Sequence, residues 1–280
     1  MSVETTTTLL KASSDRDWAV PQFNSHNMMM MKAALAAASS EKAPIIMAAG
    51  YQSFRFFSIR TLAHVMRALS EETEVPVAIH LDHARELCLV EKALEYGFSS
   101  VMFDGSSLPF EENIQKTRRV VEMARDAGAS VEGEVGIVPA PGAKPGESGL
   151  TDVDQAVEFA ERTGVDLLAV SLGSVHGMTE TSLSLDQGLL KKLGKALSVP
   201  LVLHGASGVT DDAVRQAIGH GVRKINVNTA LKALAAKRMA AVMTEKPNMD
   251  LLEVMDAGGQ AITELAVHKI RVFGASGRIH

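Results

Sequence analysis

Short apolar runs alternate with longer amphipathic segments along most of the chain. The apolar runs are rich in Val, Ile, Leu, Ala or Met, and several end in Asn, Asp or His. Runs of this length and composition predict β-strands, most of them buried. Eight strands are predicted in this way, over residues 18–24, 43–49, 75–82, 99–104, 129–136, 165–171, 199–204 and 222–228.

The segments between the predicted strands have the apolar spacing of amphipathic helices. Examples are "RTLAHVMRALSEE", "ELCLVEKALEYG" and "ENIQKTRRVVEMARDAG", and the last two end in a glycine suited to a helix C-cap. Eight strand–helix units of about 30 residues each favour a (β/α)8 barrel over a doubly wound sheet. No linker or change of composition divides the chain, so residues 1–280 are expected to form one domain.

One segment interrupts this regular alternation. Residues 136–149 read "GIVPAPGAKPGESG", and their Pro and Gly content disfavours both helix and strand. We therefore expect a mobile lid loop at this position.

Composition narrows the class of protein. The chain is 46% hydrophobic and 4% aromatic, and its net charge of -5 provides no basic surface for nucleic acid. The single cysteine, Cys88, fits a reducing compartment, and no apolar stretch is long enough to span a membrane. The N-terminal residues lack the order of a signal peptide. These features predict a cytoplasmic enzyme that binds neither nucleic acid nor membrane.

Polar residues gather where the predicted strands end. In a barrel of this kind the carboxyl ends of the strands form one rim, which carries the catalytic groups. Three histidines and several carboxylates on one rim suit a catalytic zinc with nearby acids. Any one histidine alone is better explained as a hydrogen-bonded strand end. The rim residues are Asn24, Asp82, His83, Asp104, Glu132, Glu134, His176, His204, Asn226 and Asn228.

Two glycine- and asparagine-containing loops follow the last two strands. "HGASGV" spans residues 204–209 and "INVNTA" spans residues 225–230. Such a glycine loop by itself is most often a simple turn. Loops after strands seven and eight of a barrel, however, commonly bind phosphate through backbone N–H groups. Their position makes phosphate binding the better interpretation.

These motifs, taken in order, resemble the class II zinc-dependent ketose-bisphosphate aldolases, in particular the fructose-bisphosphate and tagatose-bisphosphate branch. The resemblance implies zinc bound by His83, His176 and His204, with Glu134 near an alternative metal position. It implies that Asp82 is the catalytic acid/base, while His80 is interpreted as structural. The motifs are "AVPQFN", "HLDH", "SVMFDGSSLPFEENI", "VEGEVG", "AVSLGSVHG", "PLVLHGASGV", "KINVNTAL" and "HKIRVFGASGR".

The same resemblance assigns the remaining site residues. Glu147, the nearest acid of the lid, is the candidate that protonates the carbon left after cleavage, and Asn226 is expected to face the reacting end. A monovalent cation, Na⁺ or K⁺, is a further expectation near Gly177 and Gly205. The residues expected to hold the substrate and its phosphate are Asn24, Gly177, Gly205, Ser207, Asn228 and Thr229.

The chain also departs from the family pattern. Ala49 replaces a serine, Gly259 stands where an arginine is common, and Pro139-Ala140 replaces a Gly-Gly pair at the start of the lid. The first two groups would hold the distal phosphate in the family, so the aldehyde side of the site is expected to differ. Arg55 or Arg60 remains open as a substitute, because few side chains match arginine at phosphate.

Several functions remain open at this point. The leading one is a zinc-dependent aldolase that reversibly cleaves a phosphorylated ketose to dihydroxyacetone phosphate and an aldehyde. Alternatives are a metal-dependent isomerase or epimerase, and a non-catalytic partner subunit of a sugar-phosphate enzyme. Lys224 keeps a Schiff-base mechanism formally open, although we interpret it as mainly structural. We expect a homodimer or homotetramer.

Overall fold

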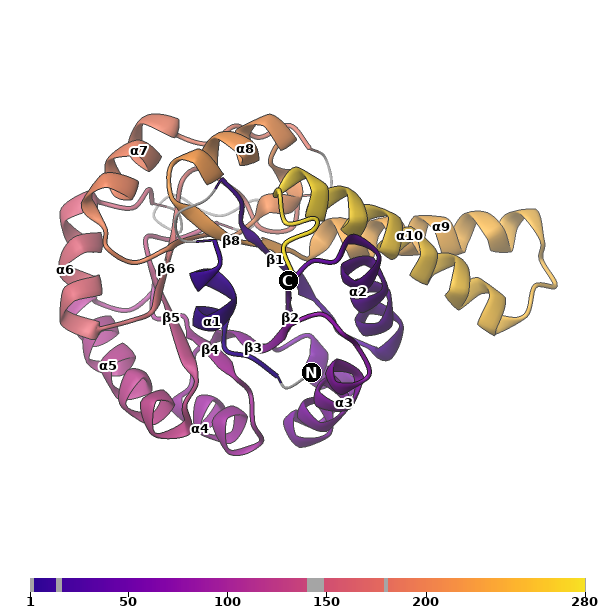
Figure 1. The fold of residues 1–280 in the computed structure, drawn as a ribbon, viewed down its shortest axis with the longest axis horizontal. Helices are drawn as coiled ribbons and strands as arrows, with labels where there is room; N and C mark the ends of the chain where they lie inside the picture. The colour runs from indigo at the N-terminus through magenta and orange to yellow at the C-terminus, as the bar shows by residue number, and fades with distance from the viewer. Residues whose placement is uncertain (1–2, 14–16, 140–148, 179–180, 280) are drawn as a thin grey trace.

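The computed structural model describes residues 3–13, 17–139, 149–178 and 181–279, and it contains a closed barrel of eight parallel strands. The strands follow one another in sequence order, and β1 pairs with β8 to close the barrel (Figure 1). The predicted (β/α)8 fold is therefore confirmed. The strands are β1 (Val20–Asn24), β2 (Ile45–Ala49), β3 (Val77–Ala84), β4 (Ser100–Phe103), β5 (Ser130–Val135), β6 (Leu167–Val170), β7 (Leu201–Leu203) and β8 (Val222–Val227).

The strands are apolar because side chains are buried on both of their faces. One face points into the barrel and the other packs against the surrounding helices, so the strands read as nearly continuous apolar runs. Every strand residue is buried except His83 and Arg223, which are partly buried. Predicted and observed strand limits agree within two residues at each end.

Helices surround the barrel, and their ends follow local sequence rules. Asp152 and Asp186 precede α6 and α7 and accept hydrogen bonds from the backbone N–H three residues later, at 2.9 Å in both cases. Gly128 and Gly164 end α5 and α6 in the left-handed conformation. The helices are α1 (Thr6–Lys11), α2 (Met28–Glu41), α3 (Ile59–Glu71), α4 (Leu87–Glu95), α5 (Phe110–Ala127), α6 (Val153–Thr163), α7 (Gln187–Ala196), α8 (Asp211–Gly219), α9 (Thr229–Glu245) and α10 (Leu251–Val272), with short 3₁₀ turns η1 (Ser53–Arg55) and η2 (Ala206–Gly208).

Helix α1 covers the amino-terminal end of the barrel. The backbone N–H of Glu4 donates to the carbonyl of Val77 at 2.9 Å, and that of Thr6 donates to Ser130 Oγ at 3.1 Å. Both acceptors lie at the start of a strand, and Figure 1 shows α1 inside the ring of helices. The carboxyl-terminal end of the barrel is therefore the end available for a site.

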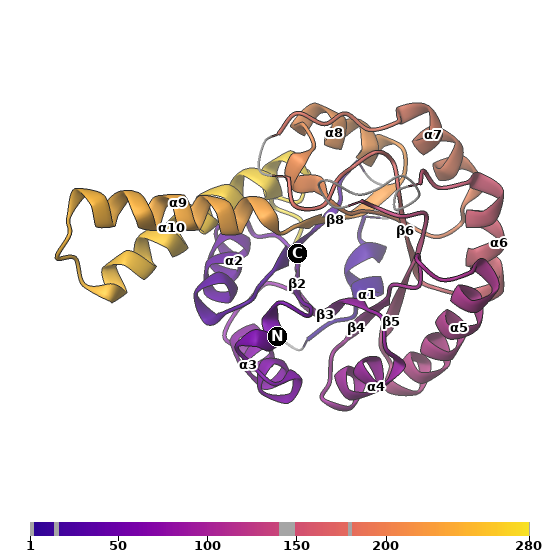
Figure 2. The same ribbon diagram turned by 180° about the vertical axis from the view of Figure 1, so that it is seen from behind.

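Helices α9 and α10 form a hairpin that extends away from the barrel, as Figures 1 and 2 show from opposite sides. Near the barrel, α10 packs against both α2 and α9. Met243, Leu251, Leu252 and Met255 are exposed apolar side chains on this hairpin. Among the described residues, no helix combines the length and the apolar character needed to cross a membrane.

Most of the predicted lid, residues 140–148, lies outside the described residues, and so does Glu147. The two ends of the segment are described, and they pair with each other. Ile137 and Gly149 form an antiparallel bridge, with N–H···O distances of 3.2 and 3.4 Å. The lid itself remains a prediction.

Candidate active site

A cavity of about 670 Å³ opens at the carboxyl ends of the strands. It is lined by residues from all parts of the sequence, because the barrel brings every strand end to one rim. Glu132, which we expected on this rim, does not line the cavity. The predicted rim and site residues that line it are Asn24, Asp82, His83, Asp104, Glu134, His176, Gly177, His204, Gly205, Ser207, Asn226, Asn228 and Thr229.

An irregularity in β3 sets the direction of the Asp82 and His83 side chains. The pairing of β3 with β4 shifts register between Leu81 and Ala84, and His83 has a φ of 51°. A bulge of this kind bends a strand and re-aims its side chains. As a result, both Asp82 and His83 line the cavity, although adjacent residues of a regular strand would face opposite sides.

Three imidazoles meet in this cavity. His83 Nε2 lies 2.9 Å from His204 Nδ1, and the ring centroids of His83 and His176 are 5.2 Å apart. One nitrogen from each of His83, His176 and His204 lies within 4.8 Å of the other two. In a tetrahedral zinc site, zinc–nitrogen bonds of about 2.0–2.1 Å place the ligand nitrogens within this same 4.8 Å limit of one another. These three residues therefore fit a zinc ion with small side-chain movements.

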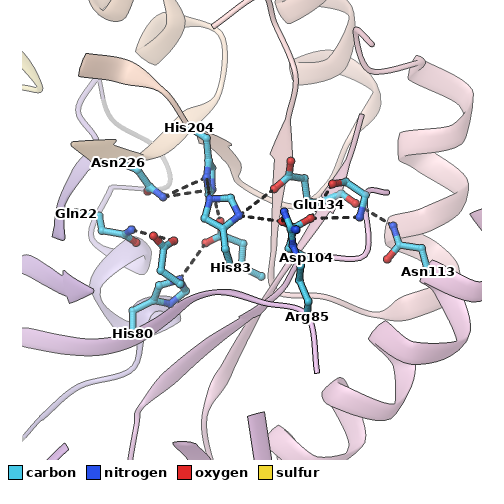
Figure 3. A network of polar contacts seen from close by, with 12 residues as sticks. Gln22, His80, His83, Arg85, Asp104, Asn113, Glu134, His204 and Asn226 are labelled. Atoms are coloured by element: carbon cyan, nitrogen blue, oxygen red, sulfur yellow. Dashed lines mark hydrogen bonds and ion pairs between the residues drawn. The ribbon is translucent and has the colours of Figure 1, made fainter. Parts of the chain in front are cut away.

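Carboxylates orient two of the three rings, as Figure 3 shows in part. His83 Nδ1 lies 3.2 Å from Asp104 Oδ2, and His204 Nε2 lies 2.8 Å from Glu132 Oε1. In both rings the other nitrogen faces the imidazole cluster. Metal-binding histidines usually have such a carboxylate behind them, because it fixes the tautomer and the ring orientation.

A second possible ligand group shares His83. It consists of His83, Asp104 and Glu134, whose side-chain atoms also lie within 4.8 Å of one another. Glu134 Oε2 is buried without a hydrogen-bond partner among the described residues, and it lies 3.7 Å from His83 Nδ1. Burial and the Asp104 carboxylate raise the pKa of Glu134 to about 8. An orphaned buried oxygen beside an imidazole is consistent with a second metal position.

The charges around the imidazoles are strongly coupled. Burial disfavours the charged ring of His83, but Asp82 and Asp104 outweigh it and raise the pKa of His83 to about 10. Burial, with the neighbouring His204 and His83 rings, lowers the pKa of His176 to about 3. A negative environment that keeps a proton on His83 also favours a divalent cation beside it.

Asp82 is held by two amide side chains from β1. Asn24 Nδ2 donates to Asp82 Oδ2 at 2.6 Å, and Gln22 Nε2 faces Asp82 Oδ1 at 3.4 Å. Burial opposes ionisation of Asp82, but the charges of His83 and His204 lower its pKa. The carboxylate is thus fixed in position and kept ionised at the cavity wall.

A charged layer lies directly beneath the cavity. The Lys224 ammonium is fully buried, lies 2.7 Å from Glu132 Oε2 and donates to Asn226 Oδ1 at 2.9 Å. Lys224 does not line the cavity, so the structure gives no support to a Schiff base there. His80 is also fully buried and contacts Ser100 Oγ through Nδ1 at 2.8 Å, as expected for a structural residue.

The two predicted phosphate loops lie side by side. Ala230 N–H, in the first turn of α9, donates to Ser207 Oγ at 3.2 Å. Gly205 has a φ of 67°, and a Cβ there would lie 3.0 Å from the carbonyl oxygen of Val175. Glycine is therefore required at this position. The arrangement places the amino-terminal end of a 17-residue helix beside the cavity, where it can bind an anion.

Several lining or supporting residues were not assigned a role from the sequence. Asp104 and Glu132 were placed on the rim, but nothing in the sequence indicated that they contact His83 and His204. Gln22 precedes Asn24 by two residues, and the period-2 alternation of a strand could have placed both on one face. Lys232 and Gln52 belong to no recognisable sequence motif. Both line the cavity, and Lys232 Nζ lies 2.6 Å from Gln52 Oε1.

The departures from the family pattern can also be placed. Ala49 is buried at the end of β2, and Gly259 lies in α10, where a Cβ would be 3.4 Å from Met29 Cγ. Arg60 is exposed in α3 and lines neither described cavity, whereas Arg55 lines a second cavity beside the first. Pro139 lines the main cavity, and Ala140 lies outside the described residues.

Comparisons with known proteins agree with this geometry. The family model described as fructose-bisphosphate aldolase class-II matches residues 4–278. The sulfofructosephosphate aldolase of Alkalicoccus urumqiensis is 35% identical over 276 residues, covering 97% of this chain and 96% of that protein. The fructose-bisphosphate aldolase of Geobacillus stearothermophilus is 36% identical over 284 residues, covering 99% of both chains.

A solved structure shows the same similarity. The YdjI aldolase from Escherichia coli K12 has a TM-score of 0.88 and 32% sequence identity, covering 99% of this chain and all of that one. The match in sequence and structure therefore extends over nearly the whole chain. The relatives' names agree on an aldol reaction and differ in the sugar phosphate. The chain belongs to the class II fructose-bisphosphate aldolase family, and it is a carbon–carbon lyase.

Proposed function

We propose that this protein is a zinc-dependent aldolase that cleaves a ketose 1-phosphate to dihydroxyacetone phosphate and an aldehyde. The observation that carries the proposal is the cluster of His83, His176 and His204 nitrogens in the cavity that Asp82 also lines. A coupled assay for dihydroxyacetone phosphate release, run over a panel of ketose mono- and bisphosphates, tests it. An isomerase or epimerase would release no such product.

The three histidines would hold the zinc ion. Zinc supplies Lewis-acid chemistry, stabilising the negative charge that cleavage leaves beside the ketone. Asp104 and Glu132 keep the His83 and His204 rings oriented through their far nitrogens. Glu134 would contribute to an alternative metal position, which its orphaned oxygen supports.

Asp82 would take the proton from the C4 hydroxyl as the bond between C3 and C4 breaks. The electrons of that bond then remain on the dihydroxyacetone phosphate half, and its C3 needs a proton. Asn24 and Gln22 hold the Asp82 carboxylate in place by donating to its two oxygens. Asn226 would face the reacting end of the substrate, and Glu147 remains the candidate donor to C3.

The phosphate of the donor half would lie between the loops that follow β7 and β8. Gly205, Ser207 and Thr229 line the cavity there beside the start of α9. Gly177 and Asn228 complete that wall. A monovalent cation near Gly177 and Gly205 is retained as a prediction.

The aldehyde side of the site leads to a prediction about substrate. Neither Ala49 nor Gly259 offers a charged group, so we expect fructose 1,6-bisphosphate to be cleaved less efficiently than a ketose 1-phosphate with a different distal end. The measurement is kcat/KM for fructose and tagatose bisphosphates against a set of 1-phosphates. A bisphosphate preferred by about 100-fold, or nearly 3 kcal/mol in the transition state, would contradict this prediction.

We also propose that the protein is a homodimer or homotetramer in the cytoplasm. The exposed apolar side chains on the α9–α10 hairpin, Met243, Leu251, Leu252 and Met255, support association. Light scattering on the purified protein should return a mass of at least two chains. A mass equal to one chain at micromolar concentration would contradict the proposal.

A further inference from the structure

His176 is held differently from the other two imidazoles of the cluster. Carboxylates contact the far nitrogens of the His83 and His204 rings. Within the described parts of the chain, no side chain forms a hydrogen bond with the His176 ring. The residue is held through its backbone instead, because its N–H donates to the carbonyl of Pro139 at 2.8 Å. The position of His176 therefore depends on the segment that follows β5, residues 136–139.

One buried hydroxyl ties the end of β5 to the end of β6. Thr151 Oγ1 donates to the carbonyl of Val135 at 2.6 Å and accepts from the backbone N–H of Ser171 at 2.8 Å. The backbone N–H of Thr151 donates to the carbonyl of Ser171 at 3.1 Å. Val135 is the last residue of β5, and Ser171 directly follows β6. A single side chain thus bridges the segment 136–139 and the loop that carries His176.

The surroundings of this hydroxyl leave it little freedom. Ser171 Oγ donates to the carbonyl of Ile137 at 3.1 Å, which makes a second tie between the same two segments. Gly136 has a φ of 83°, and a Cβ there would lie 2.6 Å from Thr151 Oγ1. Glycine is required at this position so that the hydroxyl can approach the backbone. Both partners of the Thr151 hydroxyl are buried, so its removal would leave a carbonyl and an N–H without a hydrogen bond.

We propose that Thr151 is a positioning residue for the metal site. Its hydroxyl fixes the segment 136–139 against the start of the loop after β6, and the hydrogen bond from His176 to Pro139 transmits that position to the third imidazole. Thr151 does not line the cavity, so it acts through His176 and not on the substrate. The inference rests on the proposed zinc-dependent function and adds to it the residue that places the imidazole without a carboxylate behind it.

The test replaces Thr151 by valine, which keeps the branched shape and exchanges the hydroxyl for a methyl group. The dissociation constant of zinc, measured by competition with a chelator of known affinity, should rise by about 10- to 100-fold, as is typical when a group that orients a metal ligand is lost. At saturating zinc kcat should fall, whereas KM for the ketose phosphate should change by less than about threefold, because the loops after β7 and β8 are unchanged. Thr151→Ser keeps the hydroxyl and should recover most of the loss.

Thr163→Val is the matched control. Thr163 is also buried, and its Oγ1 donates to the carbonyl of Phe159 at 2.6 Å inside α6, away from the cavity. The same chemical change removes a buried hydrogen bond at both positions, so both variants should have a lower melting temperature without metal. Only Thr151→Val should bind zinc more weakly. This comparison separates the position of His176 from the stability of the fold.

A milder variant covers the case in which Thr151→Val does not fold. Ser171→Ala keeps both hydrogen bonds of the Thr151 hydroxyl and removes only the second tie, from Ser171 Oγ to Ile137. Its zinc dissociation constant should rise in the same direction by a smaller factor, about three- to tenfold. If Thr151→Val does not fold, an unchanged zinc affinity in Ser171→Ala would contradict the inference.

Two results from the folded Thr151→Val variant would overturn the inference. One is a zinc affinity within about threefold of the wild-type value, below the loss typical of such groups. The other is an equal loss of zinc affinity in Thr151→Val and Thr163→Val, because the effect would then come from stability alone. A wild type that binds zinc but cleaves no ketose phosphate would contradict the proposed function, while the zinc comparison would still decide the role of Thr151. A wild type that binds no zinc would overturn both.

Discussion

His83→Ala is expected to lose both bound zinc and cleavage. The His83 ring contributes to the three-imidazole cluster through Nε2 and to the carboxylate group through Nδ1, so its removal affects both possible metal positions. Zinc content after dialysis should fall below about a tenth of the wild-type value, and turnover should reach background. Metal analysis by mass spectrometry and the coupled assay measure the two effects.

The control for this variant is His64→Ala, which removes an exposed histidine of α3 and should change neither zinc content nor turnover. Added zinc should restore activity to chelated wild-type protein, and magnesium should not, because imidazole ligands favour zinc. Active protein that contains no transition metal would disprove the zinc assignment.

Asp82→Asn should separate the chemistry from metal binding and folding. The amide keeps the shape of the carboxylate but does not accept the C4 proton, so turnover should fall by about 10² or more. Zinc content and the circular dichroism spectrum should remain those of the wild type, because the three histidines are unchanged. The readouts are single-turnover cleavage and metal content per chain.

Near-normal turnover of Asp82→Asn would mean that another group moves the proton. His80→Ala serves as the comparison, since His80 lies two residues away on the same strand but is buried and does not line the cavity. Its effect on turnover should be milder. A larger loss for His80→Ala than for Asp82→Asn would contradict the roles proposed for both residues.

The eight strands could be predicted from the sequence because their two buried faces produce continuous apolar runs. The rim could be predicted as well, since parallel strands of a barrel end on one side and Asp82, His83 and His204 all occur at strand ends. The resemblance then supplied roles for these residues. The apolar runs and the polar residues at their ends are local features of the sequence. They could therefore be recognised without knowing the direction of any side chain.

The parts that could not be predicted depend on contacts between distant segments. The pairing of His204 with Glu132 joins residues 72 positions apart, and the Lys232–Gln52 bond joins residues 180 positions apart. The register shift in β3 was also hidden, because "HLDHA" reads like any strand end. A one-residue change of register decides which side chains face the cavity, and composition does not encode it.

The left-handed backbone at His83 sets the stability of the fold against the metal-binding role proposed for this residue. A φ of 51° is unfavourable by about 1–2 kcal/mol for a residue with a Cβ and costs glycine almost nothing. Selection for stability alone would therefore favour glycine in the middle of the "DHA" sequence. From the proposed role of His83 we expect related chains that keep the reaction to keep histidine at this position, and chains that have lost the reaction to tolerate glycine there.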